Sequence, residues 1–291
     1  MSKILGNICV LATEHNVCRA YLGQLDDLGL VPEQILYFQR TKPDGVRIRA
    51  RSIARHVRNR LRSAVSPSRP QPIQKLPAAV RKRFLGLLKD YCVKQSFSIP
   101  DFECEMDDII VRYDSVRHVE SNQINSETVI RALADCPQEF VVFCGGGILR
   151  REILSLPKRF IHIHPGVVPD VKGADGILWS SLVRRKIGMS AFFMNEGIDT
   201  GDILKTQEYD IPRLFEFPTN AASRWQLSNF IVNFVDPVFR AKLLSELFEN
   251  NSDPGKWTTT IQNPLDGKVY YFMHDAVKQH SLRPWHGDST R

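Results

Sequence analysis

The sequence predicts an α/β protein built around a doubly wound, mostly parallel sheet. Two observations support this prediction. An apolar segment at 8–13 is followed by residues 15–28, whose apolar side chains recur at helical spacing, and then by a second apolar segment at 34–38. Farther along, residues 140–144 are all apolar and lead into three glycines, which is typical of a parallel strand buried on both faces. Strand, helix and strand in this order is how a doubly wound sheet begins.

The composition narrows the class of protein. The 291 residues suffice for one large α/β domain with an appended region, and 43% of them are hydrophobic. No apolar run approaches the length of a membrane helix, so we expect a soluble protein with no membrane partner. The N-terminus lacks a signal-peptide cleavage region, which predicts a cytoplasmic location. Six widely spaced cysteines suggest neither a zinc knuckle nor a disulfide framework.

Positive charge is concentrated in one segment. The formal net charge is +7, and seven arginines from Arg47 to Arg62 surround apolar residues spaced four apart, which predicts a basic amphipathic helix. Prolines within 67–72 end this helix, and Pro77 begins a second helical pattern. We interpret 41–105 as a helical, basic insertion. Its arginines form either a solvated helix face or a site that attracts a phosphorylated substrate.

The alternation of strands and helices resumes after this insertion. Short strands are predicted at 109–111 and 117–119, and residues 125–128 are expected to cap a helix over 129–133. A further strand is predicted at 189–194. These elements continue the doubly wound pattern.

The chain beyond Pro212 carries a looser pattern. Residues 235–248 predict a helix, and residues 258–273 predict a strand, a turn and a second strand. We therefore divide the chain into a main domain at 1–211 and a C-terminal appendage, made of a helix and a β-hairpin, at 212–291.

Two histidines and one aspartate are the candidate catalytic residues. The segment 160–164 predicts a strand that Pro165 ends, and residues two apart in a strand point to the same face. His162 and His164 are therefore expected to face one space at the carboxyl end of this strand. Asp199 lies in an Asp-Thr-Gly turn, where a carboxylate often only bonds nearby backbone donors.

These residues belong to a longer ordered string. It comprises the run Leu154–Pro169 with both histidines, then Lys172-Gly173, Trp179 and Gly188, and finally Gly197–Leu204. The string resembles the folate-dependent formyltransferase family, which includes glycinamide ribonucleotide, methionyl-tRNA and sugar N-formyltransferases. The resemblance implies a Rossmann-like formyltransferase fold and makes 1–211 the catalytic domain. It also implies an enzyme that transfers a formyl group from 10-formyltetrahydrofolate to an amine.

The resemblance assigns roles to individual residues. His164 matches the catalytic histidine of the family and Asp199 its catalytic aspartate, whereas His162 stands where the family has a catalytic asparagine. Formyl transfer forms an oxyanion, so His162 is expected to donate a hydrogen bond in place of the asparagine amide. The formyl donor is expected to lie against two backbone segments of the family pattern, namely Gly146, Gly147, Ile148 and Leu149, and Glu196, Gly197 and Ile198.

The acceptor is expected to be a small-molecule amine. The C-terminal region is too short and too poor in strands to resemble the five-stranded barrel of the tRNA-directed members, which disfavours a nucleic acid. By resemblance, a phosphorylated acceptor fits, such as a nucleotide-linked amino sugar, and so does an amine of a natural-product pathway. The sequence is compatible with a homo-oligomer and does not name the amine.

Three other functions fit the same residues. A hydrolase would split formyltetrahydrofolate with water. A metal enzyme would use His162, His164 and Asp199 as three ligands with an open fourth position. A catalytically silent relative would bind folate or a nucleotide without turnover.

Overall fold

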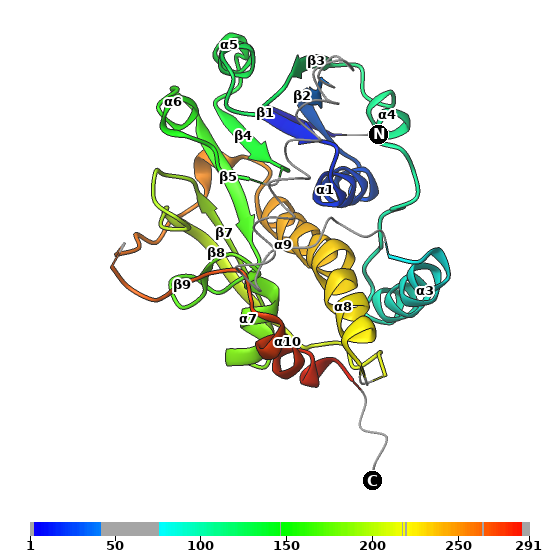
Figure 1. Cartoon of the computed structure of the whole chain (residues 1–291). Coiled ribbons are helices and arrows are strands. Elements are labelled where there is room, and N and C mark those ends of the chain that lie inside the picture. The colour runs from blue at the N-terminus through cyan, green and yellow to red at the C-terminus, as the bar shows by residue number, and fades with distance from the viewer. Residues whose placement is uncertain are drawn as a thin grey trace, which may run out of the picture.

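A seven-stranded sheet forms the centre of the computed structural model, which describes residues 3–41, 76–145, 147–216, 218, 220–263 and 265–286. Its order is β3-β2-β1-β4-β5-β7-β8 (Figure 1). The strands are β1 Lys3–Thr13, β2 Leu30–Arg40, β3 Val116–Ser121, β4 Phe140–Phe143, β5 Arg159–His164, β7 Ile187–Phe193 and β8 Ile203–Tyr209. The first five pair in parallel, whereas β7 is antiparallel to both β5 and β8. The predicted α/β fold with a mostly parallel sheet is confirmed.

Two helical layers cover the sheet. The main helices are α1 Asn16–Asp27, α3 Ala78–Lys94, α4 Met106–Ile110, α5 Glu127–Asp135, α6 Arg151–Leu154, α7 Gly176–Val183, α8 Ala221–Phe230, α9 Asp236–Asn250 and α10 Asp275–Ser281. Alternate residues of β1 face different layers. Val10 packs with α1 and α9, whereas Cys9 and Leu11 pack with α5 and α6. Both faces of β1 are therefore buried, as its apolar sequence requires.

The C-terminal half of the chain supplies the longest helix against the sheet. A π-helical segment, η1 Ile231–Val235, joins α8 directly to α9. Helix α9 contacts α1, β5 and β7, and its buried side chains belong to the same apolar cluster as those of β1. In Figure 1 it crosses the molecule behind the end of β5. Helix α9 therefore lies beside the strand that carries the histidine pair.

Smaller elements connect the C-terminal segment to the sheet region. A two-stranded sheet pairs β6 Lys172–Gly173 in parallel with β9 Val269–Tyr270. Two short 3-10 turns, η2 Pro254–Lys256 and η3 Arg283–Trp285, precede and follow β9 in the sequence. Trp285 is completely buried, and its indole N–H donates to Ser181 Oγ over 2.8 Å. This contact fixes the last described turn against the end of α7.

Two sequence-based predictions of strands are wrong. The segment 109–111 does not form a strand, because Met106, Ile109 and Ile110 are spaced to bury one face of the short helix α4. The C-terminal hairpin is not formed either. Thr260 pairs with Ile203 and β9 pairs with β6, so each half of the expected hairpin has found a partner in the preceding chain. Backbone groups need partners, and sequence alternation does not specify which strand supplies them.

Several other predictions concern residues near the described boundaries. The helix expected after Pro77 is α3, and its Phe84 ring contacts the rings of Phe215 and Phe230. The arginine-rich segment Arg47–Arg62, most of the predicted insertion 41–105, and Gly146 lie outside the described residues. The division at 211 and 212 stays a prediction.

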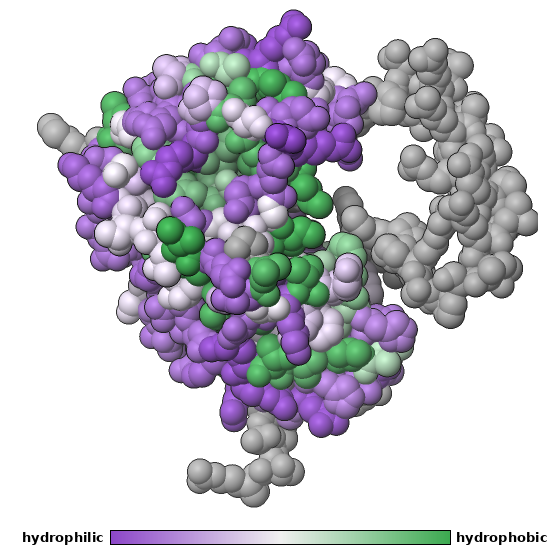
Figure 2. All heavy atoms as spheres, turned by 90° about the vertical axis from the view of Figure 1, so that its left-hand side faces the viewer, coloured by the Kyte–Doolittle hydropathy of each residue, from purple (hydrophilic) through white to green (hydrophobic). Residues whose placement is uncertain are grey.

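The described surface is mainly hydrophilic. Figure 2 shows one face of the molecule, where hydrophobic residues gather in patches between larger hydrophilic areas. None of the described helices has the length and apolar character needed to cross a membrane.

Candidate active site

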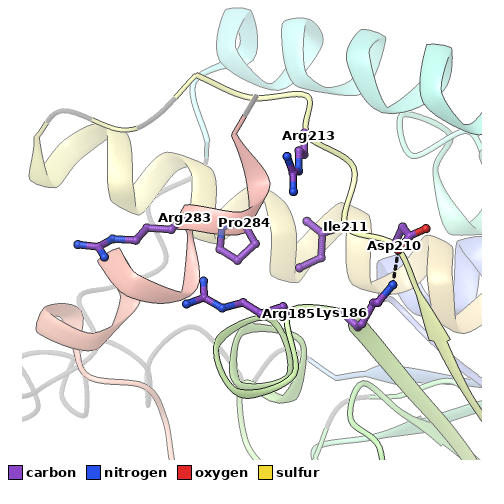
Figure 3. A pocket seen from close by; sticks show the side chains of 7 residues that line it. All are labelled: Arg185, Lys186, Asp210, Ile211, Arg213, Arg283 and Pro284. Atoms are coloured by element: carbon purple, nitrogen blue, oxygen red, sulfur yellow. Dashed lines mark hydrogen bonds and ion pairs between the residues drawn. The ribbon is translucent and has the colours of Figure 1, made fainter. Parts of the chain in front are cut away.

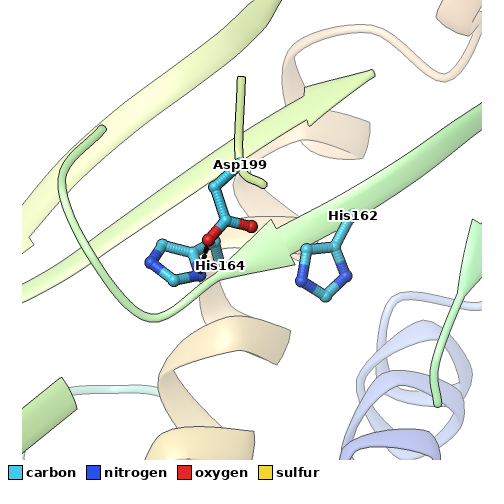
Figure 4. A group of neighbouring side chains, drawn as sticks. All are labelled: His162, His164 and Asp199. Atoms are coloured by element: carbon cyan, nitrogen blue, oxygen red, sulfur yellow. Dashed lines mark ion pairs between the residues drawn. The ribbon is translucent and has the colours of Figure 1, made fainter. Parts of the chain in front are cut away.

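The three candidate catalytic residues lie together at the carboxyl end of β5. His162 and His164 come from β5, and Asp199 comes from the turn between β7 and β8 (Figure 4). One ligand atom from each of the three side chains lies within 4.8 Å of the other two. The antiparallel pairing of β5 with β7 brings this turn back to the histidine strand. Residues separated by 35 positions in the sequence are thereby placed in one cluster.

Both ring nitrogens of His164 have partners. Nδ1 lies 3.3 Å from Asp199 Oδ2, and Nε2 lies 3.0 Å from the carbonyl oxygen of Val171. The loop after the strand must approach the ring closely to supply that carbonyl. At Gly166, an added Cβ would lie 2.4 Å from the Val171 oxygen and 2.7 Å from His164 Nε2. Glycine is therefore required at this position of the motif.

The position of Asp199 is fixed by the backbone. Its φ of 53° is in the left-handed region, and its Oδ2 accepts a 2.7 Å hydrogen bond from the backbone N–H of Gly173. Gln262 donates to the Asp199 carbonyl oxygen over 3.3 Å and also donates to the Gly201 carbonyl. The carboxylate is thus held from both the β6 side and the C-terminal segment.

His162 has a different environment. Its ring lies 6.1 Å from that of Phe143 and 5.7 Å from that of Phe192, measured between ring centroids. Its Nδ1 is buried and has no hydrogen-bond partner among the described residues. Burying an imidazole nitrogen without a partner is costly, so this atom is a candidate for contact with a bound group.

A buried ion pair lies behind the histidines. Arg240 on α9 donates through Nε and Nη2 to the two carboxylate oxygens of Asp236, over 2.6 and 2.9 Å. Its Nη1 donates to the carbonyl oxygen of Ile163, between the two histidines, over 2.7 Å. Only 13% and 7% of the Arg240 and Asp236 side chains are exposed. Helix α9 therefore positions the histidine strand directly.

Burial disfavours the charged form of both histidines. It lowers the pKa of the His162 imidazole well below its ordinary value of 6.5, and the charges of Arg240 and His164 act in the same direction. Burial also lowers the pKa of His164, although the Asp199 carboxylate opposes this shift. Desolvation therefore outweighs the neighbouring carboxylate in setting the direction of the His164 shift.

The two segments expected to hold the formyl donor lie on adjacent loops. Gly147 has a φ of 103°, Ile148 is 74% exposed and Leu149 is buried in the core. Asn125 accepts a hydrogen bond from the Arg150 backbone N–H and donates to the Ile148 carbonyl.

The second segment contains Glu196, Gly197 and Ile198, of which Ile198 is 52% exposed. Glu196 forms a 3.1 Å ion pair with Arg151, so this turn lies against the loop that follows β4. Together the loops present two exposed apolar side chains beside the polar cluster.

A second polar region was not anticipated from the sequence. It is an open pocket of about 480 Å³ lined by Arg185, Lys186, Asp210, Ile211, Arg213, Arg283 and Pro284 (Figure 3). Lys186 forms an ion pair with Asp210. Arg185 and Arg283 have no ion-pair partner among the described residues. The sequence did not indicate this pocket because its lining comes from three separate segments.

Three residues that shape the histidine site also escaped the sequence analysis. Arg240 and Gln262 lie far from the motif in the sequence. Ser190 Oγ accepts from the Val168 N–H over 3.0 Å and donates to the Gly166 carbonyl over 2.7 Å, which fixes the loop after His164. Of these three residues, only Ser190 could have been suspected from the sequence, because it lies in the strand predicted at 189–194.

The part of the chain that holds these residues is similar to a known protein family. Residues 89–216, which contain the whole polar cluster, match the family described as formyl transferase. This segment of the chain is similar to the formyltransferase family. The match begins inside α3, so the last six residues of that helix lie within the matched region.

Curated formyltransferases match a limited part of the chain. A methionyl-tRNA formyltransferase from Clostridium acetobutylicum is 37% identical over 92 residues, which are 31% of this chain and 30% of that protein. One from Campylobacter jejuni is 31% identical over 129 residues, which are 42% of each chain. The chain thus spans less than half the length of these curated relatives.

Solved formyltransferase structures are similar over longer stretches at low identity. A sugar N-formyltransferase from Shewanella sp FDAARGOS_354 is 16% identical with a TM-score of 0.44, covering 97% of this chain and 89% of that chain. The formyltransferase PseJ from Anoxybacillus kamchatkensis, in complex with a UDP-linked formamido sugar and tetrahydrofolate, is 20% identical with a TM-score of 0.37. It covers 54% of this chain and 75% of that chain.

Proposed function

We propose that this protein is a cytoplasmic, folate-dependent N-formyltransferase that transfers the formyl group of 10-formyltetrahydrofolate to the amine of a small molecule. One observation carries the proposal: the His162 ring, which has no hydrogen-bond partner among the described residues, lies in one cluster with the paired His164 and Asp199. This arrangement offers a hydrogen-bond donor and a proton-accepting pair within one cluster.

His162 is the residue best suited to stabilise the oxyanion. When the amine nitrogen bonds to the formyl carbon, the carbonyl electron pair moves onto oxygen, and a donor aimed at that oxygen lowers the barrier. The ring nitrogens of His164 are engaged by Val171 and Asp199. An N–H at His162 Nδ1 has no competing acceptor among the described residues. His162 thus takes the role of the family's asparagine.

His164 and Asp199 are the groups that handle the proton. The attacking amine must lose a proton as the carbon–nitrogen bond forms, and the Asp199 carboxylate, which the His164 ring holds in place, can accept it. The proton then returns to the carrier's nitrogen as the bond from that nitrogen to the formyl carbon breaks. The close contact between Gly173 and Asp199 keeps this pair in place during both transfers.

The formyl donor is proposed to bind against the loops that bear Gly146, Gly147, Ile148 and Leu149, and Glu196, Gly197 and Ile198. The adjacency of the two loops and their exposed isoleucines support this placement. The proposed acceptor is a nucleotide-linked amino sugar, because the PseJ neighbour is in complex with a UDP-linked formamido sugar, the compound that formylation of such an amine would give.

The test is turnover with defined acceptors. The full chain would be incubated with 10-formyltetrahydrofolate and a panel of nucleotide-linked amino sugars, with tetrahydrofolate release and formylated product measured. Product formation that requires an amine is expected. Tetrahydrofolate and formate produced without any acceptor would instead identify a hydrolase, and failure of calorimetry to detect binding of any reduced folate would refute the proposal.

A further inference from the structure

The cluster of His162, His164 and Asp199 has the ligand set and the supporting contacts of a metal site. Two imidazoles and one carboxylate lie within 4.8 Å of one another, and three protein ligands with one open position form the usual catalytic zinc site. The asparagine found in the family at position 162 would supply a weak amide ligand. The histidine in this chain supplies a strong one.

The contacts around His164 fit a metal ligand. Its Nε2 faces the Val171 carbonyl at 3.0 Å, so that nitrogen carries a proton and the lone pair of the neutral ring is at Nδ1. That lone pair points at Asp199 Oδ2 over 3.3 Å. Two lone pairs at this distance repel each other unless a proton or a cation lies between them. A histidine that donates its other N–H to a backbone carbonyl is the common arrangement around bound metals.

The surroundings of the other two ligands, Asp199 and His162, also fit a metal site. Asp199 Oδ2 is oriented by the Gly173 N–H at 2.7 Å, as ligating carboxylates usually are. His162 contributes one ring nitrogen to the cluster, and its ring has no hydrogen-bond partner among the described residues that a metal bond would have to replace. The Arg240 charge nearby is matched by Asp236, so Asp199 leaves the group with a net negative charge when both histidines are neutral.

We propose that His162, His164 and Asp199 bind a divalent transition-metal ion, with zinc as the natural probe of this nitrogen and oxygen ligand set. The proposal uses the same site as the proposed formyl transfer but does not require that activity. The two uses of His162 exclude each other, because a nitrogen bonded to a metal cannot donate to an oxyanion. Zinc is therefore expected to inhibit formyl transfer by the metal-free enzyme.

Calorimetry with zinc on metal-free, full-length protein tests the proposal. One ion per chain is expected to bind, and His162→Asn should weaken its affinity by roughly 100-fold or more, since even residues that only support metal ligands contribute 10- to 100-fold. The matched control is His118→Asn on the exposed strand β3, which should leave the affinity unchanged. Circular dichroism would verify that both variants are folded.

Cobalt substitution identifies the ligands. Visible bands of tetrahedral cobalt with nitrogen and oxygen ligands are expected in the parent protein and not in His162→Asn. Strong thiolate charge-transfer bands would place the ion on a cysteine and overturn the proposal, as would equal zinc affinity in the parent and His162→Asn. Because both readouts measure binding, their failure is separate from a failure of formyl transfer, which is assayed without metal.

The basic pocket supports a second inference by an independent observation. Its Lys186 is neutralised by Asp210, whereas Arg185 and Arg283 lack ion-pair partners among the described residues. Figure 3 shows Arg185 and Arg283 on different sides of Pro284. The wall that carries Arg283 is rigid, because the next residue but one, Trp285, is completely buried and bonded to Ser181. Two fixed positive charges beside an open cavity match a doubly charged phosphate.

We infer that this pocket binds the phosphate group of a phosphorylated ligand, and in the proposed function that ligand is the acceptor. Strand β7 begins at the pocket, and its Ser190 pairs with His164, four residues beyond Lys186, which corresponds to about 13 Å along an extended strand. A sugar joined to a diphosphate has a comparable length. Both ends of the acceptor would thus contact one strand.

Titration with inorganic pyrophosphate at low ionic strength tests this pocket without any turnover. The variant Arg185→Ser with Arg283→Ser should bind it roughly tenfold more weakly, and added salt should reduce the difference. The control, Arg117→Ser with Arg131→Ser, removes the same net charge from a distant, exposed surface and should change the affinity less than about twofold. Equal weakening by both double variants would show that pyrophosphate binds only through the protein's overall charge.

Discussion

The histidine site and the basic pocket lie at different points along β7. They differ in whether their charged side chains have ion-pair partners. At the histidine site, burial lowers the pKa of both imidazoles, Arg240 is paired with Asp236, and His164 is paired with Asp199. At the pocket, Arg185 and Arg283 have no ion-pair partner within the described structure. The charged groups of the first site are therefore held by one another, whereas two charges of the second are available to a ligand. In the proposed function, a charged acceptor would be attracted to the pocket before its amine reaches the histidine site.

The largest effect is expected from substitutions in the histidine site itself. His164→Ala and Asp199→Ala should reduce kcat of formyl transfer by roughly a thousandfold or more, and His162→Ala by roughly a hundredfold, the usual loss for one oxyanion donor. His162→Asn should retain or improve activity because it restores the family's amide donor. Steady-state kinetics on folded variants would measure this order. Full activity of His162→Ala with an inactive His164→Ala would make His162 a bystander.

The second expected effect concerns the ion pair behind the histidines. Arg240→Met leaves the Asp236 carboxylate buried without a partner, so the free energy of unfolding should fall by about 3 kcal/mol. Replacing Asp236 by leucine in the same chain should recover much of this loss, since no buried charge then remains. Urea denaturation of the two variants and the parent provides the measurement. Identical stability of Arg240→Met and the parent would show that the pair is not needed to hold β5.

The smallest expected effect is on the pH dependence of stability. His15, His162 and His164 all have a pKa lowered mainly by burial, so the unfolded chain binds more protons than the folded chain as the pH falls below about 6.5. These histidines therefore do not reduce the free energy of unfolding above this pH, and they reduce it progressively below this pH. Denaturation at several pH values should show a shallower acid loss for His162→Asn than for the parent. An unchanged slope would mean that His162 is charged in the folded state.

The sequence predicted the parts of the protein that depend on local pattern. Apolar periodicity located the central strands and α1, and the ordered motif brought His162, His164 and Asp199 to attention. It could not show that burial outweighs Asp199 in setting the pKa of His164, because desolvation depends on packing by α9 from more than 70 residues away. The failed hairpin has a similar origin, since strand pairing over long separations is decided by which backbone edge is available.

The bond from Gln262 to the Asp199 turn has a consequence for how the protein can diverge. The family match ends at residue 216, yet a glutamine 46 residues later supports the carbonyls of Asp199 and Gly201. Met273 likewise donates its backbone N–H to Asp175, within the matched segment. Substitutions in the C-terminal stretch beyond this match can therefore shift the Asp199 carboxylate without touching any motif residue. In the proposed function, the segment that must be inherited together for catalysis is longer than the segment by which the family is recognised.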